Sequence, residues 1–120
     1  MHYTPGTHIL LDLHDAHHLN EVETIRKVML DAAHEVGAHV VDQKFHVFGG
    51  GAGVTGVVLL RESHISIHTW PESCFAAVDI FLCGGLSADP AIDLMRRVLR
   101  AGRVEVTKVT RGQNRDTPAG

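Results

Sequence analysis

The sequence of 120 residues has few cysteines, no long apolar run and no excess of positive charge. Its two cysteines, Cys74 and Cys83, form no CxxC pair, which argues against a disulfide framework or zinc knuckle and favours a reducing compartment. No apolar run approaches the roughly 20 residues that span a bilayer, and the N-terminus lacks the basic region followed by an apolar core that is typical of a signal peptide. A net charge of −3 provides no electrostatic footprint for nucleic acid. We therefore expect a cytoplasmic protein with no membrane or nucleic-acid partner.

The overall composition is that of an ordinary globular domain, with 44% apolar and 21% charged residues. Ten histidines are the one unusual feature, and three of them, His14, His17 and His18, lie beside Asp15 in a polar stretch. A solvated loop is the simplest explanation of this stretch. A structural or adventitious metal site is the alternative. We predict no metal site.

Apolar periodicity predicts six strands and two helices in the order strand, helix, four strands, helix, strand. Strands dominate and short connections favour hairpins. We therefore predict an α+β fold, a two-layer sandwich of a mainly antiparallel sheet with two helices on one face. Residues 1–120 are expected to form a single domain, of which 111–120 is a flexible polar tail. The expected strands are 7–13, 38–48, 54–60, 64–70, 75–83 and 103–110.

Both helices carry recognisable end signals. The first is predicted over 20–36, with Asn20 as N-cap, Glu23 at the capping-box position and Gly37 as the C-terminal stop. The second is predicted to be capped by Asp89, with Pro90 at its first helical position.

A glycine-rich run at 49–53 does not match a phosphate-binding loop. That motif requires Gly-Lys-Ser/Thr, whereas Val54-Thr55-Gly56 follows here. A flexible hairpin loop is the better interpretation, in which glycine allows backbone to approach backbone or substrate closely.

Most of the reactive side chains are concentrated in residues 62–72, ESHISIHTWPE, and the run that follows ends in Cys83-Gly84. A buried strand has little structural need for two serines, two histidines and two carboxylates within eleven residues. Together these segments closely resemble the pyruvoyl-dependent S-adenosylmethionine decarboxylases of bacteria and archaea. The resemblance extends from about residue 6 to residue 110.

A decarboxylase of this kind needs an electron sink, which no ordinary side chain provides. None of Lys27, Lys44 and Lys108 lies in a setting typical of a pyridoxal phosphate Schiff base, so a carbonyl made from the chain is the consistent choice. The resemblance implies that Ser63 attacks the Glu62 carbonyl, and that elimination then separates 1–62 from 63–120. The remaining pyruvoyl group, made from Ser63, would bind the substrate amine as a Schiff base.

The resemblance also assigns roles to five other residues. It implies that His68 is the proton acceptor in processing, and that Cys83 is the proton donor in decarboxylation. Without it, Cys83 would be a small core residue. Glu72 would bind the ribose hydroxyls, Phe48 would stack on adenine, and Thr55 would support processing by polarising the Glu62 carbonyl.

Two details of the sequence do not fit simply. Arg61 departs from the small residue expected before the cleavage site. Strict strand alternation places Ser63 on the face of Ile65, opposite His68. Either the strand begins only after Ser63, or the chain turns sharply at 62–63.

The favoured hypothesis is an enzyme that supplies the aminopropyl donor for spermidine synthesis. The resemblance implies a homodimer with active sites near the interface. Three alternatives remain: a decarboxylase of ornithine or arginine on the same scaffold, an unprocessed regulatory or binding paralogue, and a histidine-rich metal-binding protein. Phe48 and Glu72 favour the nucleoside substrate, because both would contact adenosine.

Overall fold

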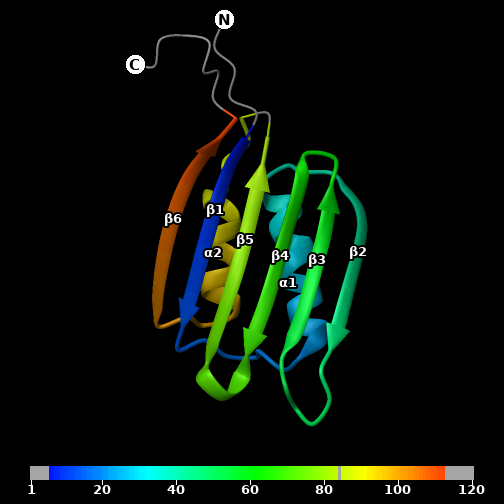
Figure 1. Cartoon of the computed structure of the whole chain (residues 1–120), viewed down its shortest axis with the longest axis vertical. Coiled ribbons are helices and arrows are strands. Elements are labelled where there is room, and N and C mark those ends of the chain that lie inside the picture. The colour runs from blue at the N-terminus through cyan, green and yellow to red at the C-terminus, as the bar shows by residue number, and fades with distance from the viewer. Residues whose placement is uncertain (1–5, 84, 113–120) are drawn as a thin grey trace, which may run out of the picture.

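The computed structural model describes residues 6–83 and 85–112, in which two helices cover one face of a six-stranded sheet (Figure 1). The strand order is β2-β3-β4-β5-β1-β6, and every neighbouring pair is antiparallel. This confirms the predicted α+β class. The elements are β1 Gly6–His14, α1 Val22–Glu35, β2 Val40–Val47, β3 Val54–Leu60, β4 Ser63–Trp70, the 3-10 turn η1 Pro71–Ser73, β5 Phe75–Leu82, α2 Asp89–Val98 and β6 Arg103–Arg111.

Both α helices are crossover connections. Strands β2 to β5 follow one another through short turns, whereas α1 carries the chain from β1 across to the far edge at β2. Helix α2 carries it from β5 past β1 to β6. Both helices lie behind the sheet in Figure 1, and no helix of the described residues covers the opposite face, here called the helix-free face.

Side chains along the central strands alternate between the two faces of the sheet, which places the buried core residues and the histidines of β4 on opposite faces. In β4, Ile65 and Ile67 are fully buried against the helices, whereas His64, Ser66 and His68 take the alternate positions on the helix-free face. Each fully buried side chain of this size stabilises the fold by about 1.5–3 kcal/mol. The two histidines of this strand are therefore on the helix-free face, whereas Ser63 and the buried Thr69 take positions on the other face.

The two predicted helix caps are wrong. Helix α1 begins at Val22, and its N-cap is Glu21, not Asn20. The Glu21 carboxylate bonds to His18 and Thr24 instead of to a helix N–H, so the turn before the helix determines where it starts. Gly37 is confirmed as the stop, with φ +80°.

In α2 the N-cap is Ala88, and Asp89 is the first helical residue. The backbone N–H of Asp89 donates to Ser87 Oγ at 3.2 Å, and its carboxylate lies in the first turn, where negative charge suits the helix dipole. The predicted tail also begins too early, because Arg111 pairs with Gly6 at the end of β6. Residues 113–120 lie outside the described part of the chain.

The glycine-rich loop between β2 and β3 contains a close backbone approach. A Cβ at Gly53 would overlap the carbonyl oxygen of Thr69, so only glycine fits there. Gly50 and Gly51 adopt positive φ and turn the chain, while Gly49 has open space around it. The predicted role of glycine in this loop is confirmed.

We expect Gly53→Ala to lower the free energy of unfolding by about 2 kcal/mol, because β3 and β4 must move apart to admit the methyl group. Gly49→Ala is the matched control, and its effect should stay within about 0.5 kcal/mol. Urea denaturation of both variants checks this. Equal losses at the two positions would contradict it.

Candidate active site

The turn between β3 and β4 holds the predicted cleavage bond. Strand β5 ends beside the start of β4, with Ser63 opposite Leu82. This register places the backbone N–H of Cys83 3.1 Å from the carbonyl oxygen of Glu62, to which it donates. The structure therefore brings Glu62, Ser63 and Cys83 together at one end of the sheet.

Ser63 has an unusual backbone. Arg61 and Glu62 form a two-residue hairpin turn, a length that favours glycine or asparagine with positive φ. Neither residue adopts positive φ, and the unusual angle falls instead on Ser63, at φ +141°. Such a conformation costs a residue with a side chain about 1–3 kcal/mol. Of the two alternatives for this junction, the chain turns sharply and Ser63 belongs to the strand.

The Ser63 hydroxyl has a histidine partner in its own strand. Ser63 Oγ lies 3.3 Å from Nδ1 of His64, close enough for a weak hydrogen bond. The ring of His64 packs edge-on against Phe81 and His8, which come from β5 and β1. His64, to which the resemblance assigns no specific role, is therefore the imidazole next to the predicted nucleophile.

The Glu62 carboxylate is held by a residue that the sequence analysis missed. His39, in the connection between α1 and β2, donates its backbone N–H to Oε1 at 2.9 Å and bonds through Nδ1 to Oε2 at 2.7 Å. The backbone N–H bond, followed by the imidazole bond, holds the pKa of Glu62 below its usual value. No local signal could have indicated this contact, because 23 residues separate its partners.

A second group of predicted residues lies at the opposite end of β3 and β4. Phe48, Thr55, His68 and Glu72 line one pocket of about 450 Å³, together with Trp70 and the glycine-rich loop. Thr55 Oγ1 lies 3.1 Å from Nδ1 of His68, because the two residues pair across the strands. Aromatic side chains that can stack on a base and a carboxylate that can accept hydrogen bonds from ribose lie in the same pocket, a combination that suits a nucleoside.

The two groups do not meet within one chain. His68 follows Ser63 by five residues of extended strand, a separation of roughly 17 Å. Thr55 pairs with His68 and is equally far from the cleavage bond. Within a single chain, the only partner found for the Glu62 carbonyl among the described residues is Cys83.

A family model described as S-adenosylmethionine decarboxylase matches residues 7–112, nearly all of the chain. The chain belongs to this family. Membership confirms the interpretation drawn from residues 62–72 and Cys83, that of an S-adenosylmethionine decarboxylase proenzyme, a pyruvoyl-dependent carboxy-lyase.

Individual relatives agree in sequence and in fold. The S-adenosylmethionine decarboxylase proenzyme of Thermosipho melanesiensis is 44% identical over 90% of this chain and 85% of its own length. That of Caldicellulosiruptor saccharolyticus is 43% identical over 89% and 88%. The crystal structure of the adenosylmethionine decarboxylase from Aquifex aeolicus superposes with a TM-score of 0.84, at 38% identity and 92% coverage of both chains.

His8, on β1, is a further histidine beside His64 at the cleavage end of the sheet. His8 Nε2 is buried and has no partner among the described residues, while Arg111 donates to His8 Nδ1 at 3.2 Å. Asp79 lies 4.0 Å from that Nε2. An unpartnered donor beside His64 and Phe81 fits a site that receives a polar group of a ligand.

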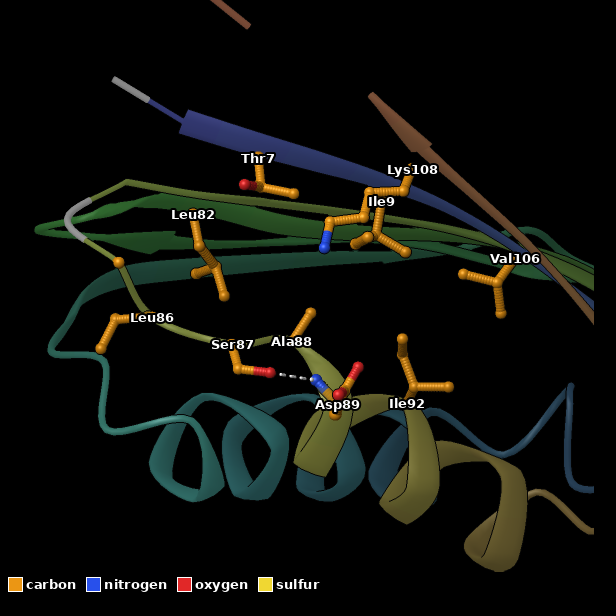
Figure 2. Close-up of a pocket in the computed structure, with 11 residues that line it drawn as sticks. Thr7, Ile9, Leu82, Leu86, Ser87, Ala88, Asp89, Ile92, Val106 and Lys108 are labelled. Carbon is orange, nitrogen blue, oxygen red and sulfur yellow. Dashed lines mark hydrogen bonds between the residues drawn. The ribbon is translucent and has the colours of Figure 1, made fainter. Parts of the chain in front are cut away.

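A second pocket of this decarboxylase lies apart from the predicted residues. A pocket of about 330 Å³ lies between the sheet and the start of α2, where Figure 2 shows the Lys108 amino group and the Asp89 carboxylate. It is lined by none of the predicted site residues.

No helix in residues 6–83 and 85–112 is long and apolar enough to cross a membrane.

The histidine stretch contributes one residue, His14, to a group of possible metal ligands. In the part of the chain that the structure describes, the one group of three potential ligands is Asp12, His14 and Glu105, without His17 or His18. His14 is bonded to Glu105 at 2.7 Å, and the Arg103 guanidinium lies 3.4 Å from the same oxygen. That positive charge opposes a cation there.

The positive φ of Ser63 predicts how substitutions at this position change the free energy of unfolding. In uncleaved chains, Ser63→Gly should be more stable than Ser63→Ala by about 1 kcal/mol, because glycine adopts φ +141° without strain. At Ser66, on the same strand without positive φ, the order should reverse. Urea denaturation of the four variants measures both differences. A stabilising Ser66→Gly, or no difference at Ser63, would refute strain as the cause.

Proposed function

We propose that this chain cleaves itself between Glu62 and Ser63 and then, in pyruvoyl form, decarboxylates S-adenosylmethionine to the aminopropyl donor for spermidine synthesis. The observation that carries the proposal is the Cys83 N–H on the Glu62 carbonyl, directly beside a strained Ser63. The enzyme is expected in the cytoplasm, where reducing conditions keep the free thiol of Cys83 available.

The proposed cleavage begins with an acyl shift. Ser63 Oγ forms a bond to the Glu62 carbonyl carbon, the peptide C–N bond breaks, and the hydroxyl proton moves to the nitrogen of Ser63. Negative charge develops on the Glu62 oxygen during the attack. The Cys83 N–H already donates to that oxygen at 3.1 Å, so it can stabilise this charge without rearrangement.

An elimination completes the process. Removal of the Cα proton of Ser63 breaks the Cβ–Oγ bond and releases Glu62 as a carboxylate at the end of segment 1–62. Water then replaces the nitrogen on Cα and ammonia leaves, which produces the pyruvoyl group on segment 63–120. No oxidant is required. Imidazoles are the groups suited to move these protons, His64 from the same chain and His68 from a second one.

The pyruvoyl carbonyl would supply the electron sink for loss of carbon dioxide. Cys83 is half-buried at the same end of the sheet and is the group proposed to return a proton to the substrate Cα. Phe48 and Glu72 are proposed to hold adenine and ribose in the pocket at the other end of β4.

The distance between these two ends favours a homodimer. A second chain that turns its pocket toward Ser63 of the first would complete two equivalent sites about a twofold axis. The helix-free face supports such pairing, because four large apolar side chains are exposed on it: Leu10, Leu59, Trp70 and Val109. His68 and Thr55 would then reach the partner's cleavage bond.

Denatured intact mass tests the cleavage. We expect fragments 1–62 and 63–120, the second lighter by one ammonia than a fragment that begins with serine. Ser63→Ala should remain one chain. A wild-type chain that stays uncleaved after long incubation would contradict the proposal and favour the regulatory paralogue. Side-by-side turnover on S-adenosylmethionine, ornithine and arginine identifies the substrate.

Cys83→Ala should separate the two activities. Its backbone N–H remains, so cleavage should proceed, whereas decarboxylation should fall at least about 100-fold with loss of the proton donor. Fragment mass and release of carbon dioxide measure the two steps. Full decarboxylase activity in the cleaved variant would exclude the thiol as the donor.

The homodimer makes a quantitative prediction for mixed chains. Ser63→Ala lacks the precursor, and Glu72→Ala lacks the ribose ligand, so each should be nearly inactive alone. Co-expressed, half of the dimers are mixed, and each has one intact site of two, which should restore about a quarter of wild-type activity. No restoration would mean that Ser63 and Glu72 act within one chain.

A further inference from the structure

We infer that His39 is a positioning residue for self-cleavage, which fixes Glu62 so that its carbonyl stays against the Cys83 N–H. The inference rests on the proposed cleavage at Glu62–Ser63. It concerns a residue far from that bond in sequence, on a different connection of the fold.

Three hydrogen bonds join His39 to the residues before the cleavage bond. Its carbonyl accepts the Arg61 N–H at 2.8 Å, and its own N–H donates to Glu62 Oε1 at 2.9 Å. Nδ1 lies 2.7 Å from Oε2. Because an ionised carboxylate only accepts, Nδ1 carries the proton in this bond. Both carboxylate oxygens and the preceding backbone are therefore held by one residue.

This arrangement limits the motion of the acyl half of the bond. The Glu62 side chain is fixed by His39 and its carbonyl by Cys83, on two separate connections of the fold. With both ends held, rotation about the bonds of Glu62 that would turn the carbonyl away from Ser63 Oγ must break a hydrogen bond. A misplacement of about 1 Å can slow such a reaction 100-fold.

The Glu62 carboxylate keeps its charge under ordinary conditions. The His39 bonds lower the pKa of Glu62, with the backbone N–H as the largest cause. A lowered pKa in the folded state means that the interaction is present above the usual glutamate range and is lost as the pH falls through the lowered value. The contact is therefore intact at neutral pH, where cleavage would occur.

The chain contains a matched control pair. His18 Nδ1 bonds to Glu21 Oε2 at 2.8 Å, at a solvent-exposed position just before α1. The His18 and Glu21 side chains are 38% and 52% exposed, so they form a similar histidine–carboxylate contact in water. Loss of this pair removes a comparable bond without touching the cleavage turn.

The experiment follows the first-order appearance of fragment 63–120 after a pulse of synthesis. His39→Ala should slow cleavage about tenfold, through the loss of one hydrogen bond to a charged group. His39→Asn should stay within about twofold of wild type, because its amide nitrogen can occupy the Nδ1 position. His18→Ala should also stay within about twofold. Thermal midpoints of uncleaved Ser63→Ala chains with and without each change show whether the fold is altered.

Hydroxylamine identifies the step affected. It cleaves esters, so it would split any chain stalled after the acyl shift. We expect the uncleaved His39→Ala chain to resist hydroxylamine, because His39 acts on the carbonyl before the ester forms. A chain that accumulates hydroxylamine-sensitive ester would overturn the assignment to positioning of Glu62.

A double-mutant cycle tests the route through Glu62. Glu62→Ala should slow cleavage at least as much as His39→Ala, and adding His39→Ala to it should cause no further loss. A further tenfold loss would overturn the inference. Equal rates for wild type and His39→Ala would do the same while leaving the proposed function intact. A wild-type chain that never cleaves would instead refute the proposed function.

Discussion

The site depends on the antiparallel pairing of β4 with β5. The register that sets Ser63 opposite Leu82 also sets the next N–H of the chain, that of Cys83, on the Glu62 carbonyl. A shift of one residue would exchange the two faces of β4 and remove that contact at the same time. The buried Ile65 and Ile67 oppose such a shift, because it would expose them. Core packing and chemistry are therefore coupled through one strand pair.

One face of the sheet packs against the helices, and the other carries most of the polar side chains. The helices bury one face and make it apolar, which leaves histidines, Ser66 and Asp79 together on the other. Polar groups at such density are tolerable because no apolar layer formed by residues 6–83 and 85–112 covers the helix-free face. In the proposed dimer, a second copy would enclose these groups and exclude water from them.

The prediction of strands succeeded where local pattern was sufficient. Val54–Leu60 was predicted with its observed bounds, and both faces of β4 were assigned correctly from alternation. The prediction of the helix N-caps was wrong because Asn20 and Asp89 have favoured N-cap side chains but lie one position away from the observed N-caps, Glu21 and Ala88. A capping preference of about 1 kcal/mol is small beside the packing of a whole helix.

The sequence by itself determined the family, the fold class and the reactive residue types, because these are written in contiguous segments such as 62–72. Only the tertiary structure decided which of those residues meet. It joined Glu62 to Cys83 and to His39, and it separated Ser63 from His68 along one strand. The physical reason is that strand register and crossover connections bring distant residues together, whereas an extended strand carries near neighbours apart.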